Sequence, residues 1–486
     1  MNRPIRQVIA LVVVMFLVLM TAATYIQFFQ AKSLNADSRN VRTLYDSYNV
    51  QRGQIIVGGK AIASSTAIDD LYKYQRSYSN GALYSNLTGY MSVTQNALTG
   101  LEKAANGTLS GQSDSLAGQR FSELFTGKAP AGGSVELTID PVLQEAAAKA
   151  LGNQRGAVVV LDPSTNAIKA QVSTPGFDPN QLATHSRKDA DAAYTALNTD
   201  ATEPLVDRAT GGDQHAPGSS FKLVTAAAML ENNPQLTADS LVDAPLSYTP
   251  AGTTHQIWNP GRAACGNGSG KVTLQQAFVQ SCNTTFAIGG VNVGADAMIK
   301  QAEKFGFNQS FTTPLAVSAS RFPQPEDTAA LAMDSFGQRD VRVTPMQMAM
   351  VGAAIANKGK LMKPYLVAKE LNSDLETVST TTPTLMSTPI SERTAAEMNK
   401  MMVAEVAEGT GYRAQIPGVT VAGKTGTAEI NSTTPPDVWF VGYAPAESPK
   451  YVVAVMVENT GNYGWGGDGG SVAAPIAKQV LESKLG

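Results

Sequence analysis

Three short motifs carry the side chains that could do chemistry in this chain. A serine and a lysine stand three residues apart at Ser219 and Lys222, and this is the only Ser-x-x-Lys in the sequence. Ser281 and Asn283 form a Ser-x-Asn motif, and Lys424 opens the only Lys-Thr-Gly sequence. Since Ser-x-Asn also occurs elsewhere in the chain, the order and spacing of the three motifs are the signal.

The first pair suits nucleophilic catalysis at the start of a helix. A Pro-Gly pair precedes an apolar run from Phe221 to about Leu230, so we expect Ser219 at the N-terminus of a helix. Backbone N–H groups there have no intrahelical partner, and the helix dipole favours a developing anion. Lys222 lies on the same face, and a desolvated lysine near other cations has a lowered pKa and can accept the proton of the serine. The alternative is a serine that caps the helix beside a solvated lysine.

The second motif offers a proton relay and a side-chain amide. We expect it in a segment that joins two helical stretches. A hydroxyl at Ser281 could pass a proton between the nucleophile and a leaving amine. Asn283 both donates and accepts hydrogen bonds, so it can hold a substrate amide. A turn that caps a helix would explain the same residues without any chemistry.

The third motif is expected on a strand. Thr425 and Thr427 then share one face, while Lys424 lies on the other. Gly426 lets a substrate backbone approach closely, Lys424 attracts a carboxylate, and the two threonine hydroxyls can bind it. The N–H of Thr427 could complete an oxyanion hole with that of Ser219. An ordinary edge strand rich in Lys and Thr is the alternative.

Other catalytic arrangements have little support in the sequence. The histidines are His185, His215 and His255, and none lies in a Gly-x-Ser-x-Gly context; we expect His215 in a loop. No His-Glu-x-x-His and no Cys/His cluster appears, so we expect no metal and no other cofactor. The formal net charge of −3 gives no indication of nucleic-acid binding.

The N-terminus predicts a membrane anchor. Residues 8–26 carry no charge and are rich in Val, Leu and Met, which is long enough to cross a bilayer as a helix. Arg3 and Arg6 precede this segment, so residues 1–7 should stay in the cytoplasm and the bulk of the chain should lie outside the cell membrane as a single-pass protein. A cleaved signal peptide is the alternative, but its apolar region is usually shorter.

The two cysteines are expected to pair. Cys265 and Cys282 lie in the part of the chain that is predicted to be extracytoplasmic. An even number of cysteines in that environment permits a disulfide. Because Cys282 stands between Ser281 and Asn283, the bond would brace the second motif. Two buried free thiols are the alternative.

The remaining pattern predicts an α+β protein with a separate N-terminal region. Residues 35–133 show short strand-like runs and no catalytic pattern, and 128–133 resemble a linker. Residues 134–486 hold the three motifs, and their last strands are followed by a terminal helix while the middle is helical. This order favours an antiparallel sheet flanked by helices plus an all-helical subdomain. We expect strands at 134–139, 156–161, 168–172, 419–430, 438–443 and 451–458, and helices at 141–151, 346–357, 391–407 and 473–483.

With these motifs in order behind a predicted anchor, the chain resembles a class B penicillin-binding protein, close to the actinobacterial PbpA type. The resemblance covers nearly the whole chain. Further elements that match it are Arg52-Gly-Gln-Ile55, Gly100-Leu-Glu102, Asp162-Pro163, Phe177–Asn180, Val343-Thr-Pro345 with Gln347, and Trp439–Gly442 followed by Ala444-Pro445.

The resemblance implies a fold and an activity. It implies the penicillin-binding transpeptidase fold at 134–486, behind an N-terminal pedestal or dimerisation-type domain at 35–133. Such proteins are peptidoglycan D,D-transpeptidases, in which Ser219 would attack a D-Ala-D-Ala stem peptide and β-lactams would acylate the same serine. It assigns catalysis to Ser219, Lys222 and Ser281. The residues that it assigns to substrate binding are Asn283, Lys424, Thr425, Gly426 and Thr427. A SEDS-family glycan polymerase is implied as a partner.

The chain departs from the family pattern at two positions. Relatives usually have Gly-Gln-Gly where this chain has Gly337-Gln338-Arg339, so the geometry of that loop is open. Ser220 replaces the usual threonine after the nucleophile, which should be harmless.

Other functions of the same motifs have less support in the sequence. A bifunctional class A enzyme needs a glycosyltransferase domain, and the first region is too short for one. A membrane-anchored serine β-lactamase would need an additional glutamate to activate water, which we cannot place. A D,D-carboxypeptidase and a non-catalytic scaffold for cell-wall synthesis stay as alternatives, the scaffold being disfavoured by intact Ser219, Lys222 and Lys424. A β-lactam sensor would need several membrane spans.

Overall fold

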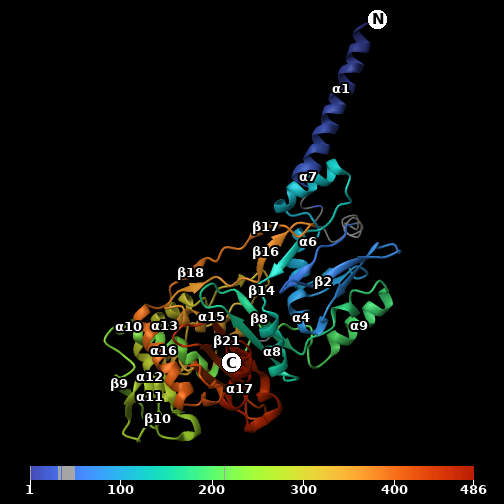
Figure 1. The fold of residues 1–486 in the computed structure, drawn as a ribbon. Coiled ribbons are helices and arrows are strands. Elements are labelled where there is room, and N and C mark those ends of the chain that lie inside the picture. The colour runs from blue at the N-terminus through green and yellow to red at the C-terminus, as the bar shows by residue number, and fades with distance from the viewer. Residues whose placement is uncertain (1, 31–33, 35–49, 213) are drawn as a thin grey trace.

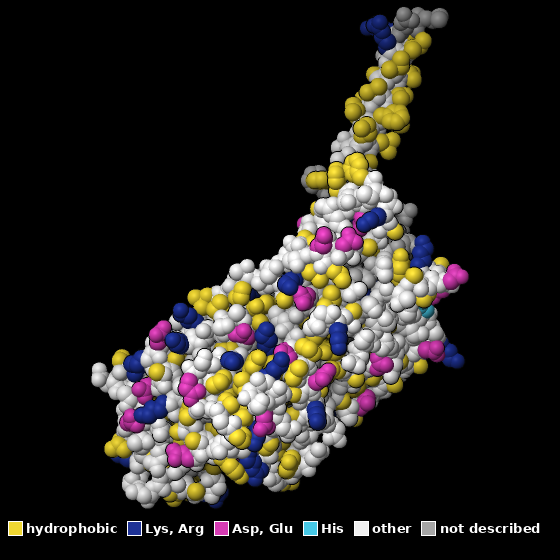
Figure 2. All heavy atoms as spheres, in the orientation of Figure 1, with side chains coloured by type: hydrophobic (Ala, Val, Ile, Leu, Met, Phe, Trp, Pro, Cys, Tyr) yellow, Lys and Arg dark blue, Asp and Glu magenta, His cyan; other side chains and the backbone are white. Residues whose placement is uncertain are grey.

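The structure of the protein is a computed structural model that describes residues 2–30, 34, 50–212 and 214–486. The predicted anchor is α1 (Asn2–Thr24), continued by a π-helical turn at Tyr25–Phe29, and it projects from one end of the molecule (Figure 1). The span 3–28 is long and apolar enough to cross a membrane. In Figure 2 hydrophobic side chains cover this helix, whereas charged and neutral groups are mixed over the visible face of the rest.

A five-stranded antiparallel sheet forms the centre of the C-terminal part. Its strand order is β19-β20-β21-β7-β8, so β19 is an edge strand. Helix α15 packs on one face, and α8 and α17 pack on the other. The strands are β7 (Gly156–Leu161), β8 (Ile168–Thr174), β19 (Ala422–Ala428), β20 (Asp437–Ala444) and β21 (Tyr451–Val457), and the helices are α8 (Pro141–Leu151), α15 (Pro345–Ala356) and α17 (Ala474–Leu485).

Strand β7 shows why these segments become central strands. All six of its residues are buried, and its side chains alternate between the two cores. Val159 contributes to the core on the α15 side, whereas Val158 and Val160 contribute to the core beneath α8 and α17. A strand with apolar residues on both faces must be covered by helices on both sides, as this one is.

The helices expected at 141–151 and 346–357 are present as α8 and α15, and each begins at a side-chain cap. Asp140 accepts hydrogen bonds from the N–H groups at the start of α8, with Pro141 at the first helical position. Thr344 caps α15 in the same way, again before a proline. Both arrangements satisfy donors that would otherwise have no partner at the helix N-terminus.

A helical subdomain lies beside β19. It packs α10 on α12 and α13, α12 on α14, and α11 on α16. Short two-stranded ribbons join these helices. The helices are α10 (Lys222–Asn232), α11 (Leu274–Val279), α12 (Asn283–Val293), α13 (Ala295–Lys304), α14 (Thr328–Asp334) and α16 (Glu392–Glu408). The ribbons are β9 (Leu241–Asp243) with β12 (Lys271–Thr273), β10 (Ser247–Tyr248) with β11 (Ile257–Trp258), β13 (Phe311–Thr312) with β14 (Ala316–Val317), and β15 (Leu361–Met362) with β18 (Leu385–Ser387).

The N-terminal region shares a sheet with later parts of the chain. The order of this six-stranded sheet is β17-β16-β6-β1-β2-β3. Strands β1–β3 come from the first region, whereas β6, β16 and β17 follow the expected boundary at 133. The sheet therefore joins the two regions. Its strands are β1 (Ile55–Val57), β2 (Lys60–Ala67), β3 (Tyr74–Tyr78), β6 (Ser134–Leu137), β16 (Val367–Leu371) and β17 (Thr377–Thr380).

Small elements complete the first region, and one helix lies near it. They are α4 (Gly81–Thr88), β4 (Met91–Ser92), β5 (Ala97–Leu98), α5 (Gly100–Ala104), α6 (Asn106–Leu109), α7 (Ala117–Thr126) and, from later in the chain, α9 (Arg187–Thr199). Two elements on which the family resemblance rests meet here, because Arg52 and Arg76 both pair with the buried carboxylate of Glu102. A buried carboxylate of this kind needs such partners.

Candidate active site

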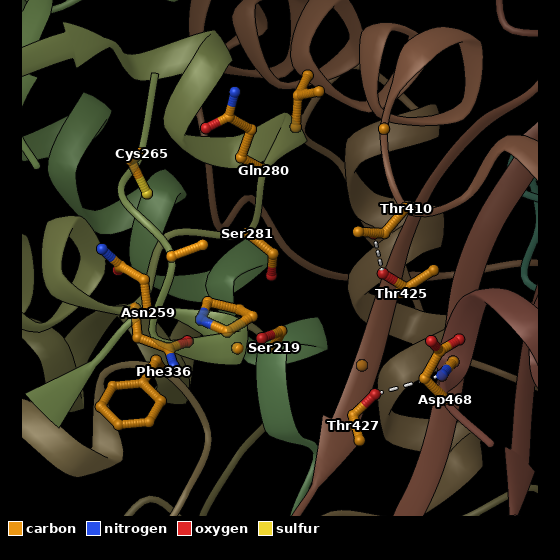
Figure 3. Close-up of a pocket in the computed structure, with 18 of the residues that line it drawn as sticks. Ser219, Asn259, Cys265, Gln280, Ser281, Phe336, Thr410, Thr425, Thr427 and Asp468 are labelled. Carbon is orange, nitrogen blue, oxygen red and sulfur yellow. Dashed lines mark hydrogen bonds between the residues drawn. The ribbon is translucent and has the colours of Figure 1, made fainter. Parts of the chain in front are cut away.

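A cleft of about 1430 Å³ lies between the edge strand β19 and the helical subdomain. Its lining contains residues of all three motifs: Ser219, Ser281, Asn283, Thr425, Gly426 and Thr427. Figure 3 shows Ser219 between Ser281 on one side and the two threonines of β19 on the other. The site is open at the sheet edge because β19 has no further strand beyond it.

Ser219 lies in a 3₁₀ turn, Gly218–Phe221, that leads directly into α10. The turn packs tightly against β19, because a Cβ atom at Gly218 would lie 2.4 Å from the Thr427 carbonyl oxygen. A Cβ at Gly426 would lie 2.6 Å from the Pro217 carbonyl oxygen. The close approach that we expected at Gly426 is therefore made by the chain's own backbone, which holds the nucleophile against the strand.

Lys222 is buried beneath the nucleophile. Its Nζ lies 2.9 Å from Ser219 Oγ, 2.7 Å from the Ser281 carbonyl oxygen and 2.7 Å from Asn283 Oδ1. Burial lowers the pKa of Lys222 well below its usual range, and the positive charge of Lys424 lowers it further. A neutral amine has two N–H donors and one lone pair. If the donors serve Ser281 and Asn283, the lone pair can accept the proton of Ser219.

The backbone at Ser281 turns this residue toward the lysine. Its φ is +56°, a left-handed conformation that is uncommon outside glycine and often found at functional sites. With this turn, Lys222 Nζ also lies 3.2 Å from Ser281 Oγ. Asn283 begins α12, and its Nδ2 donates to the Trp258 carbonyl oxygen at 2.8 Å.

The predicted disulfide is present next to this turn. Cys265 and Cys282 are bonded, with their Cα atoms 6.3 Å apart, and both are buried. The N–H of Gly266 also donates to Gln280 Oε1 at 2.8 Å. The loop that carries Cys265 is thus tied on both sides of Ser281.

Lys424 occupies an unexpected place, because its side chain is fully buried. Thr425, Gly426 and Thr427 line the cleft, but Lys424 is not among the described residues that line it. Its Nζ lies 3.5 Å from Oε1 of the equally buried Glu405. Burial lowers the pKa of Lys424, and Glu405 opposes that shift. In this structure the partner of Lys424 is a carboxylate of the protein, whereas we expected one from the substrate.

Thr425 and Thr427 do face the cleft, as the strand pattern predicted. Glu405 Oε1 accepts from the N–H and Oγ1 of Thr425, at 3.2 and 3.0 Å. Thr410 Oγ1 donates to the same carboxylate at 2.7 Å. Thr427 Oγ1 accepts from the N–H of Gly469 at 3.2 Å. One buried glutamate therefore organises the start of the motif.

Sequence reasoning missed Glu405 and Thr410. One signal could have found the glutamate. On α16 the positions Ala395, Met398 and Met402 are buried at helical spacing, and Glu405 continues the same stripe. An acidic residue on the apolar face of a helix indicates a buried partner. The identity of that partner was not readable from the helix.

His215, which we expected in a loop, makes a backbone bridge and a side-chain contact. Its backbone bridges to Val343, and its ring Nδ1 lies 2.7 Å from Asp437 Oδ2. This pairing directs the imidazole to the start of β20. The structure therefore gives no support to a Ser-His arrangement at Ser219.

The loop with the unusual Arg339 also has a clear geometry. Arg339 has φ +55°, the conformation that glycine adopts without cost. Its guanidinium lies 2.7 Å from Glu326 Oε2 and 3.0 Å from Asp340 Oδ2. Gly337 packs so closely that a Cβ there would lie 2.1 Å from the Gly218 carbonyl oxygen. The loop thus keeps its tight contact with the nucleophile turn.

Comparison with known families settles the ancestry of this site. Residues 156–482 match the penicillin binding protein transpeptidase domain, and residues 52–135 match the penicillin binding protein A dimerisation domain. The chain belongs to the penicillin-binding protein transpeptidase family. The transpeptidase match lies inside the region expected at 134–486, whereas the dimerisation match ends at residue 135, two residues beyond the boundary expected at 133.

Relatives of this penicillin-binding protein are similar over their whole length. The peptidoglycan D,D-transpeptidase PbpA of Mycolicibacterium smegmatis is 41% identical, and the alignment covers 100% of this chain and 99% of the relative. The PbpA of Mycobacterium tuberculosis is also 41% identical over the same shares.

The fold is also similar to solved structures of penicillin-binding protein A. The ceftriaxone acyl-enzyme complex of penicillin-binding protein A from M. tuberculosis is 39% identical, with a TM-score of 0.86, and the match covers 91% of this chain and 100% of that one. Its penicillin G acyl-enzyme complex is 40% identical, with a TM-score of 0.84, and the match covers 90% and 100%. The class of fold expected from the sequence is therefore confirmed.

Proposed function

We propose that this protein is a peptidoglycan D,D-transpeptidase that cross-links stem peptides through an acyl-enzyme at Ser219 and is inhibited covalently by β-lactams. The observation that carries this proposal is the contact between Ser219 Oγ and the buried Lys222 amine, 2.9 Å apart, at the edge of an open cleft. Whole-length similarity to curated D,D-transpeptidases supports the choice of reaction.

Acylation begins at the penultimate D-Ala carbonyl of a D-Ala-D-Ala stem peptide. Burial lowers the pKa of Lys222 and so favours its neutral form, which takes the proton of Ser219 as Oγ forms the new C–O bond. The N–H groups of Ser219 and Thr427 receive the negative charge of the tetrahedral oxygen. The C–N bond then breaks, and the terminal D-Ala leaves after its nitrogen gains the proton through Ser281.

Deacylation repeats these steps in the opposite direction. An amine of a neighbouring stem peptide attacks the ester carbonyl and loses a proton to the Lys222–Ser281 pair. The new amide bond forms, and Ser219 regains its proton. No other reactant is consumed, because the energy of the broken peptide bond is kept in the ester. A β-lactam opens its ring in the first half of the cycle and leaves no amine to diffuse away.

The binding roles follow from which groups face the cleft. Asn283 holds the substrate amide, and Thr425 and Thr427 bind its terminal carboxylate through their hydroxyls. Gly426 keeps β19 close to the nucleophile turn. The ammonium group of Lys424 is paired with Glu405 inside the protein. Lys424 therefore contributes its positive charge from beneath the strand.

The chain divides into parts with separate roles. Residues 1–7 are cytoplasmic, 8–26 cross the lipid bilayer as a single anchor, 35–133 form a pedestal or dimerisation-type domain, and 134–486 form the transpeptidase domain. Residues 35–49 of the pedestal lie outside the described residues. The apolar span of α1 supports the anchor, and the family supports a SEDS-family glycan polymerase as the partner in the membrane.

Intact-mass spectrometry after incubation with penicillin tests the proposal. The wild-type protein should gain one adduct, and Ser219→Ala should gain none. Ser220→Ala is the matched control, because its hydroxyl donates to the Pro217 carbonyl oxygen and is buried beside the nucleophile. An adduct that persists in Ser219→Ala would remove Ser219 from the mechanism. Release of D-Ala with joining of two stem peptides, as opposed to hydrolysis, separates a transpeptidase from a carboxypeptidase or β-lactamase.

A further inference from the structure

Helix α7 carries its apolar side chains on the outside. Phe121, Leu124 and Phe125 are 65%, 80% and 73% exposed. Their spacing of three and four residues places them on one face of the helix. The rings of Phe121 and Phe125 lie 4.6 Å apart between centroids, so the face is continuous.

The face of α7 that meets the protein is polar. Glu123 is its buried residue, and Gln119 Nε2 donates to Glu123 Oε1 at 2.6 Å. Gln119 also bonds to the Ala131 carbonyl oxygen and accepts from the N–H of Ser373. A helix on the surface of a water-soluble domain has the opposite arrangement, with its apolar stripe toward the core. The reversed arrangement points to an apolar environment outside the protein.

The position of α7 indicates what that environment is. Figure 1 shows α7 at the end of the molecule from which α1 projects, away from the helical subdomain at the opposite end. The exposed aromatic residues Tyr25 and Phe28 lie in the π-helical turn that follows α1, and aromatic side chains favour the boundary between lipid and water. An anchor in the bilayer therefore brings the membrane surface to the end of the protein that carries α7.

We propose that α7 lies in the lipid–water interface and inserts Phe121, Leu124 and Phe125 among the lipid chains. The inference rests on the proposed membrane anchor, which supplies the first attachment; α7 is the second. Three side chains on a ten-residue helix suit shallow insertion better than a stable protein interface, which needs a much larger area. Two attachments restrict the tilt of the pedestal relative to the membrane.

Fluorescence quenching in nanodiscs tests this proposal with the full-length chain. Phe125→Trp places an indole on the apolar face with little change in size. The protein is incorporated at one copy per disc, in phosphatidylcholine with or without bromine on the acyl chains. Wild-type protein supplies the background of the natural tryptophans Trp258, Trp439 and Trp465. The matched control is Leu241→Trp, an exposed apolar position on β9 in the helical subdomain.

The introduced indole at position 125 should lose most of its emission in brominated lipid, and the indole at position 241 should lose none. Acylation of each variant by fluorescent penicillin shows that it is folded. Equal emission in both lipids at position 125 would overturn the proposal and would assign the face to a protein partner. Because the two lipids differ only in the bromine on their acyl chains, quenching can come only from contact with lipid.

A second position separates this inference from the anchor itself. Leu17→Trp lies within α1 and should be quenched if the anchor crosses the bilayer. Quenching at position 17 without quenching at position 125 would refute α7 insertion and leave the anchor in place. Loss of quenching at both positions would refute the anchor.

Discussion

Replacement of Glu405 should change catalysis, although Glu405 does not line the cleft. Its effect should reach the nucleophile through Lys424 and Lys222. Glu405 is the buried counter-ion of Lys424, at 3.5 Å. The charge of Lys424 in turn helps to lower the pKa of Lys222. In Glu405→Gln the ammonium group loses its counter-ion, so the pKa of Lys424 falls further and less of it is charged at neutral pH. The pKa of Lys222 then rises.

The expected shift follows from the direction of each effect. Lys222 acts as a base only when neutral, so acylation increases as the pH rises through its pKa. We expect the acid limb of this pH profile to move upward by about one unit in Glu405→Gln, which corresponds to about a tenfold slower acylation at a pH on that limb. The glutamine oxygen can still accept from Thr425, so the maximum rate at high pH should be largely kept.

Glu405→Leu should be worse, because it removes the acceptor as well as the charge. Donors on Thr410, Thr425 and Lys424 would lose their partner inside the protein. Removing one partner of a buried ion pair lowers the free energy of unfolding by about 3–5 kcal/mol. Thermal unfolding should therefore occur several degrees lower than in the wild type or in Glu405→Gln.

The assay is stopped-flow acylation by a chromogenic cephalosporin between pH 5 and 9, with the unfolding temperature measured on the same samples. Glu397→Gln is the matched control, because Glu397 lies on the same helix and accepts from the N–H of Ala238, outside the lining of the cleft. Its pH profile should match the wild type. An unchanged acid limb in Glu405→Gln would refute the coupling of Glu405 to Lys222, whatever the effect on stability.

Four further outcomes are expected. Lys222→Ala should abolish acylation but keep the fold, since alanine favours helices, and circular dichroism with mass spectrometry checks both. Replacing Cys265 and Cys282 by serine should slow acylation and lower stability by about 3 kcal/mol, which stopped-flow and urea unfolding measure; an unchanged rate would restrict the bond to stability. Burial raises the pKa of Asp334 from 3.8 to about 7. The folded state thus holds this proton more tightly than the unfolded state, and about 3 kcal/mol of stability is lost as the pH rises from 4 to 7; Asp334→Asn should flatten that dependence in urea titrations. Arg339→Gly should be more stable than Arg339→Ala by about 1 kcal/mol, because both lose the ion pairs and only alanine keeps a Cβ at positive φ; equal unfolding midpoints would contradict this.

The sequence by itself determined much of the local structure. The helix expected at 141–151 coincides with α8, which Asp140 caps, and the strand expected at 156–161 coincides with β7. Such features depend on neighbours along the chain, through caps, periodicity and turn residues, so a single sequence contains them. The three motifs were also readable, because their residue types limit the chemistry that they can do.

Tertiary structure decided which side chains meet. The strand pattern placed Lys424 opposite the threonines, but only the packing of α16 against β19 showed that Glu405 is its partner. The pairing of β6 with β1 and β16 likewise joined two regions that composition had separated. Contacts between distant segments depend on how whole layers pack, and no local pattern records that. The outward apolar face of α7 was also decided by tertiary structure. The sequence of an amphipathic helix shows which residues share a face, but only the contacts of the helix show which face is turned outward.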